Sequence, residues 1–70
     1  MKQIVLVENM SCQHCVKQVR SHFLGMNGVS DVVVHLETKE VAVTTAVQHR
    51  LSDFQTSLVD TVYEAVAIKE

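Results

Sequence analysis

The 70-residue sequence contains no proline and no tryptophan, and it has only two glycines, two cysteines and six basic residues. Without proline and with so little glycine, the chain offers no linker, so we expect a single domain over residues 1–70 with short connections. The eight acidic residues give a net charge of -2. This balance argues against nucleic-acid binding, which needs a strongly basic surface.

Long hydrophobic runs are absent as well. The apolar run near the N-terminus covers only residues 4–7, whereas a signal-peptide core needs roughly 7–15 residues and a membrane span about 20. We therefore expect no membrane insertion and a cytoplasmic location, where lasting structural disulfides are rare.

The periodicity of the apolar residues divides the chain into six segments. Alternating apolar residues or short Val- and Ile-rich runs predict strands, at residues 2–8, 29–36, 40–46 and 62–68. Steps of three and four predict helices, at residues 13–24 and 50–61. Ser11 or Cys12 is expected to cap the first helix, and Gly25 to end it. The order β-α-β-β-α-β predicts a ferredoxin-like α+β fold, with a four-stranded antiparallel sheet and two helices on one face.

Both cysteines lie in the segment MSCQHC, residues 10–15, where the first predicted strand leads into the first helix. Cys12 and Cys15 have the spacing C-x-x-C. A helix N-terminus offers free amide donors and a positive dipole end, which favour thiolate over thiol. Because the thiolate is both the nucleophile and the metal ligand, the position predicts a reactive site.

Four kinds of site have this spacing. A structural disulfide would close a very short loop and gain little stability. A thioredoxin-like redox pair also lies at a helix start, but that fold has a cis-proline facing the cysteines, and this chain has no proline. A structural zinc site needs four ligands, and neither a second cysteine pair nor a suitably spaced histidine pair is present. Thiolates select Cu(I), for which two sulfur ligands suffice, so the residues favour Cu(I) over Zn(II).

The M-x-C-x-x-C motif at Met10, Cys12 and Cys15, the GVSDVVVHL and VAV stretches and the Tyr63 region resemble heavy-metal-associated domains over nearly the whole chain. The closest resemblance is to bacterial copper chaperones of the CopZ type. It implies that Cys12 and Cys15 bind Cu(I), or the similar ion Ag(I), and exchange it with a copper-transporting P-type ATPase. Such a carrier is not an enzyme, and two copies sharing one ion would form a copper-bridged homodimer.

The span from Met1 to just past the last predicted strand favours a free-standing protein. The alternative within the family is a metal-binding domain excised from a copper ATPase. The alternative from another class is a small thiol-disulfide redox protein.

Two positions depart from the family pattern, because Asn9 and Val62 stand where the family often has glycine. Asparagine tolerates the left-handed backbone conformation, so we expect the turn before Met10 to be kept. The valine is expected to affect the shape of the last loop more than the thiol pair.

Four residues near the motif have alternative roles. The thioether of Met10 is a soft ligand, but we expect it to anchor the loop in the core, as the resemblance also implies. Ser11 stands where relatives that handle divalent ions often carry Asp, which favours Cu(I). His14 is expected to face solvent, unless it tunes the thiolates or supplies a third ligand between two molecules. Tyr63 either shields the thiolates or is a half-buried strand residue.

Lys17 and Arg20 are three residues apart on the first predicted helix and share a face. Beside an open metal site they are expected to steer docking onto an acidic partner. The other histidines are expected to be ordinary surface or boundary residues, namely His22, His35 and His49.

Overall fold

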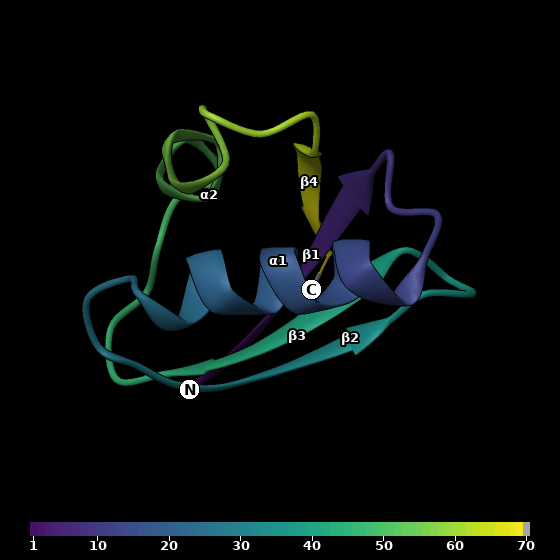
Figure 1. The fold of residues 1–70 in the computed structure, drawn as a ribbon. Coiled ribbons are helices and arrows are strands. Elements are labelled where there is room, and N and C mark those ends of the chain that lie inside the picture. Colours follow the sequence, from purple (N-terminus) through teal and green to yellow (C-terminus); the bar gives the residue numbers. More distant parts are fainter. Residues whose placement is uncertain (70) are drawn as a thin grey trace.

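The computed structural model describes residues 1–69 and confirms the ferredoxin-like fold (Figure 1). Its elements, in chain order, are β1 (Lys2–Glu8), α1 (Gln13–Leu24), β2 (Val29–His35), β3 (Glu40–Thr45), α2 (Leu51–Ser57) and β4 (Glu64–Lys69). Within the described residues the four strands form one sheet in the order β2-β3-β1-β4, and every neighbouring pair is antiparallel. No helix in this part of the chain has the length and apolar character needed to cross a membrane.

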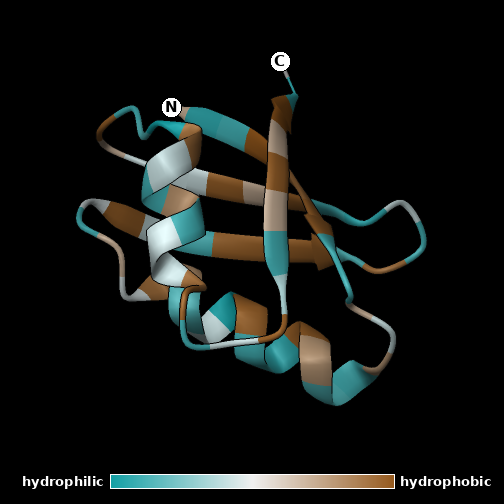
Figure 2. Cartoon of the chain, turned by 90° about the horizontal axis from the view of Figure 1, so that it is seen from above, coloured by the Kyte–Doolittle hydropathy of each residue, from teal (hydrophilic) through white to brown (hydrophobic). Residues whose placement is uncertain are grey.

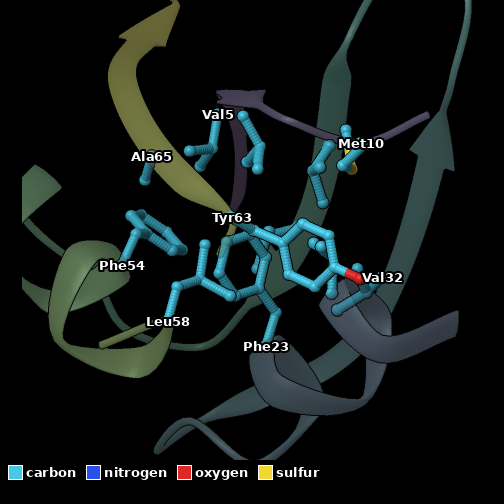
Figure 3. Packing of buried hydrophobic residues seen from close by; sticks show 12 residues of the cluster. Val5, Met10, Phe23, Val32, Phe54, Leu58, Tyr63 and Ala65 are labelled. Atoms are coloured by element: carbon cyan, nitrogen blue, oxygen red, sulfur yellow. The ribbon is translucent and has the colours of Figure 1, made fainter. Parts of the chain in front are cut away.

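The hydrophobic core lies between the sheet and the two helices. Alternation along the strands directs one set of side chains inward, as in β1, where Val5 and Val7 are fully buried. Figure 2 shows hydrophobic residues running along the strands and hydrophilic residues in much of the connecting loops. Phe23 of α1 and Phe54 of α2 meet over the inner face, with ring centroids 5.1 Å apart and planes tilted by 59°. This aromatic pair joins the two helices in one cluster (Figure 3).

The second helix is shorter than the predicted range of residues 50–61, because it ends at Ser57. The apolar spacing continues to Leu58, but the N–H of Leu58 donates to the carbonyl three residues earlier, at 3.2 Å, so the last turn tightens. The hydroxyl of Thr61 donates to the Leu58 carbonyl at 2.7 Å and accepts the N–H of Tyr63 at 3.1 Å. These local side-chain bonds replace helical ones and delay β4 to Glu64 rather than residue 62.

Two non-glycine residues in turns have left-handed backbone, Asn9 with φ 72° and Lys39 with φ 62°. The first confirms that the turn after β1 is kept with asparagine in place of glycine. The second lies between β2 and β3 and was not expected from its residue type, since lysine has no local side-chain bond that favours this conformation. The ammonium of Lys39 lies 3.1 Å from a carboxylate oxygen of Glu8 on β1.

The connection between β3 and α2 is held by Gln3, a polar side chain that is only 7% exposed. Its amide donates to the carbonyl of His49 and accepts the N–H of the same residue, each at 2.8 Å. The imidazole of His49 in turn lies 2.8 Å from the carbonyl of Asn27. His49 is therefore a boundary residue that helps to close this end of the molecule.

Candidate metal centre

The cysteine loop, residues 9–12, connects β1 to α1 and presents the thiol pair at one end of the sheet. Asn9 reverses the chain with its left-handed backbone. Met10 then enters the hydrophobic core and is only 5% exposed (Figure 3). A thioether that packs in the core stabilises the loop from beneath and does not face an ion on the surface, so its burial supports the anchor interpretation.

Cys12 is the N-cap of α1, with extended backbone at φ -150° and ψ 167°. Its Sγ accepts the N–H of Cys15 at 3.3 Å, in the place where an oxygen usually satisfies the first turn. The alternative cap, Ser11, is wrong, because the chain enters the helix only at Gln13 and Ser11 precedes the capping position. The Cys12 sulfur therefore caps the N-terminus of α1 and is also exposed to solvent.

Cys15 lies in the first turn of α1 and is half-buried, while Cys12 is exposed, and both cysteines are free. Their Sγ atoms lie 2.7 Å apart and share a hydrogen bond. This bond from Cys12 is the main reason that the pKa of Cys15 falls from 9.0 to about 6; the Tyr63 hydroxyl and the Ser11 backbone lower it further. At neutral pH Cys15 is therefore mostly a thiolate, the form that binds metal.

Tyr63 stands at the end of the last loop, residues 58–63, is only 7% exposed and has the Cys15 sulfur as a neighbour. The neighbouring Cys15 sulfur and burial raise the pKa of Tyr63 to about 12, so its hydroxyl keeps its proton. The hydroxyl donates to Oε1 of Gln18 at 2.7 Å. It thus has two acceptors at hand, the amide oxygen of Gln18 and the thiolate of Cys15.

Gln18 also lies at the site, through its contact with Tyr63, and was not predicted from the sequence. Its Nε2 lies 3.1 Å from Nε2 of His14, one helical turn earlier. An amide nitrogen only donates, so the lone pair of that histidine nitrogen is used in this contact. His14 is exposed, as expected. The signal for Gln18 was its position three residues after Cys15, on the same face of the helix.

The two basic residues of α1 differ in their contacts. Lys17 is exposed to solvent. The Nε of Arg20 donates to the carbonyl of Val32 on β2 at 3.0 Å, and its guanidinium lies 4.0 Å from the carboxylate of Asp31. Arg20 therefore ties α1 to the edge strand of the sheet, and only Lys17 is left as a freely oriented charge on this face.

Two sulfurs that lie 2.7 Å apart are the candidate metal-binding groups at this end of the molecule. Within residues 1–69 no group of three or more His, Cys, Asp or Glu side chains is arranged to hold a metal ion. The donor set does not fit a closed four-ligand zinc site. It does fit a soft monovalent ion, for which two or three sulfurs are enough.

The lowered pKa of Cys15 predicts how its reactivity depends on pH. We expect its alkylation by iodoacetamide to reach half of its maximal rate near pH 6, because the thiolate is the nucleophile and the pKa is about 6. The rate should fall as the pH falls below that value. Peptide mass spectrometry separates the two cysteines, and replacing Cys12 by alanine should move the midpoint upward, toward about 8.5. A midpoint near 8.5 in the unmodified chain would contradict this prediction.

Comparisons with known proteins agree with this geometry. The model of the heavy-metal-associated domain matches residues 4–64. The copper chaperone CopZ of Bacillus subtilis (strain 168) is 53% identical over 38 residues, which cover 54% of this chain and 55% of that protein. The copper chaperone CopZ of Staphylococcus epidermidis is 43% identical over 42 residues, covering 60% of this chain and 62% of that protein. The matched stretch thus spans less than two thirds of either relative.

A solved structure of a CopZ metallochaperone has the same fold. Its TM-score is 0.82 at 31% sequence identity, and the alignment covers 94% of this chain and 100% of that chain. The family model extends from β1 into β4 and includes both cysteines. The chain therefore belongs to the heavy-metal-associated domain family.

Proposed function

We propose that this chain is a Cu(I) carrier, which binds the ion through Cys12 and Cys15 and passes it to a partner by ligand exchange, without catalytic turnover. The observation that carries the proposal is the pair of free thiols at the start of α1, with sulfurs 2.7 Å apart and one pKa near 6. The similarity to proteins named copper chaperones supports the choice of Cu(I). Ag(I) has the same soft character and is expected to bind as well.

The exposure of the two cysteines suggests the course of the exchange. Cys12 faces solvent, whereas Cys15 is half-buried beside Tyr63. A thiolate of the partner therefore approaches on the Cys12 side and binds the ion before Cys12 leaves it. Because a third sulfur is bound before the first is lost, the ion need not be released to water. Cys15 is expected to be the last ligand to dissociate.

The proposed partner is the metal-binding domain of a copper-transporting P-type ATPase, whose own cysteine pair would take over the ion. A second copy of this chain offers the same ligands, so a copper-bridged homodimer is the alternative acceptor. We propose that the exchange takes place in the cytoplasm and that residues 1–70 act as one metal-binding domain. The match of the heavy-metal-associated domain model to residues 4–64 supports the single domain.

A competition titration tests the proposal. The reduced chain is mixed with Cu(I) held by a strong chromophoric chelator, and transfer of the ion is followed by absorbance. We expect each chain to take one Cu(I) from the chelator. Zn(II) should bind more weakly, because two thiolates supply only two of the four ligands that zinc needs. Preference for Zn(II) would contradict the proposal. Measurable insulin reduction would instead favour a thiol-disulfide redox protein.

Partner docking is tested best at Lys17. Replacing Lys17 by glutamate should slow Cu(I) transfer to an acidic partner domain at low salt by about tenfold, because charge steering acts on the association rate. The Cu(I) affinity should stay the same, since Lys17 is not a ligand. The transfer rate is measured by stopped flow, with Lys2→Glu on β1 as the matched charge control. Arg20 is less suitable, because its bond to β2 makes a structural effect unavoidable. Equal rates for Lys17→Glu and the control would argue against docking on this face.

A further inference from the structure

Two side chains tie the last loop to the thiol site from different elements. The Nδ2 of Asn9, in the cysteine loop, donates to the carbonyl of Val62 at 2.9 Å. The Oε1 of Gln18, on α1, accepts the hydroxyl of Tyr63 at 2.7 Å. Val62 and Tyr63 are adjacent, so the two bonds hold consecutive residues of the same loop.

The bond from Asn9 joins the two positions that depart from the family pattern. A glycine at position 9 would adopt the observed φ of 72° without strain, but it has no side chain with which to reach the last loop. Val62 contributes its carbonyl and little packing, because its side chain is 75% exposed. The backbone φ of Val62 is not positive, so this position does not require glycine and valine fits without strain. Asn9 thus lacks the backbone freedom of glycine but gains a hydrogen bond to the last loop.

The bond from Gln18 determines where the ring of Tyr63 lies. The hydroxyl donates to Oε1 of Gln18, which lies three residues after Cys15 on the same face of α1. The amide is itself oriented, since its Nε2 lies 3.1 Å from the His14 ring. The body of the ring is packed in the core (Figure 3). Its hydroxyl reaches Gln18 on α1.

We propose that Asn9 and Gln18 are positioning residues, which together hold the last loop against the cysteine loop and keep Tyr63 beside Cys15 before metal arrives. This inference rests on the proposed function in one respect, namely that the thiol pair is the metal site. The consequence is that one side of Cys15 is already shielded from water and small competitors. Exchange is then confined to the open Cys12 side.

The single tyrosine allows a direct test in the metal-free chain. Because there is no tryptophan, the intrinsic fluorescence reports Tyr63 alone. In the double variant Asn9→Gly with Gln18→Leu, we expect the acrylamide quenching constant of this emission to rise about twofold or more, because the loop is released. Gln18→Glu keeps an acceptor oxygen for the Tyr63 hydroxyl, so its quenching constant should equal that of the parent. Gln48→Leu, at the other end of the molecule beside Met1 and Lys2, is the matched control.

A second measurement follows the metal. The rate at which Cu(I) is removed by a small chelator should rise about threefold or more in the double variant, because Cys15 loses its shield. The two single variants are included in case the double variant does not fold, and each should change both readouts in the same direction. A quenching constant of the folded variants equal to that of Gln48→Leu would overturn the inference and leave the carrier proposal intact. Failure of the parent to bind Cu(I) would overturn the carrier proposal. The fluorescence result would still test the positioning of Tyr63, because it is measured without metal.

Discussion

Serine in place of both Cys12 and Cys15 is expected to lower the Cu(I) affinity in the competition titration by more than about 100-fold. Loss of a residue that only supports a ligand typically costs 10–100-fold in metal affinity, and here both ligands themselves are lost. Serine keeps the size of the side chain, but its hydroxyl is a hard ligand and stays protonated at neutral pH. These are the only cysteines of the chain, so no other thiolate replaces them.

The single variants sharpen this prediction. Cys15→Ser removes the sulfur whose pKa is about 6, whereas Cys12→Ser removes the main hydrogen bond that lowers this pKa. Both should weaken binding. In Cys12→Ser the pKa of Cys15 should move upward, toward about 8.5, so protons should compete with the metal already at neutral pH, where Cys15 of the parent is mostly a thiolate. Ser11→Ala is the matched control, because its backbone contact to Cys15 is kept. Retention of parental affinity by the double serine variant would refute the assignment of the ligands.

Replacing Phe23 by alanine is expected to lower the free energy of unfolding by about 3–5 kcal/mol, the usual cost of removing a buried aromatic ring. Phe23 is fully buried and forms the contact between α1 and Phe54 of α2. A domain of this size has a total stability of only about 4–10 kcal/mol. The variant should therefore lose a large part of its stability in a urea titration followed by circular dichroism.

The same experiment has an internal comparison on the last loop. Val59 is 73% exposed, and its replacement by alanine should change the free energy of unfolding by less than about 0.5 kcal/mol. Cu(I) should raise the melting temperature of Phe23→Ala, since an ion that binds only the folded chain stabilises it. If Phe23→Ala cost no more than Val59→Ala, the aromatic contact would not be the centre of the core.

Most of the architecture could be read from local patterns. The period of apolar residues predicted all six elements, and the strand ends differ from the prediction by at most two residues. The second helix was the exception, because the spacing that includes Leu58 does not reveal that the Thr61 hydroxyl competes for its carbonyl. The burial of Met10 followed from the same kind of reasoning, since an apolar residue in a polar loop is expected to reach the core.

The sequence by itself determined the thiol pair, because Cys12 and Cys15 are three positions apart and any helix beginning there brings them together. Only the tertiary structure decided what surrounds the pair. Tyr63 meets Gln18 across 45 positions, and Asn9 meets Val62 across 53. Periodicity shows which face of an element is buried, but it does not show which residue of a distant element lies opposite. That depends on how the sheet and helices pack, and here the packing places the last loop on the thiol site.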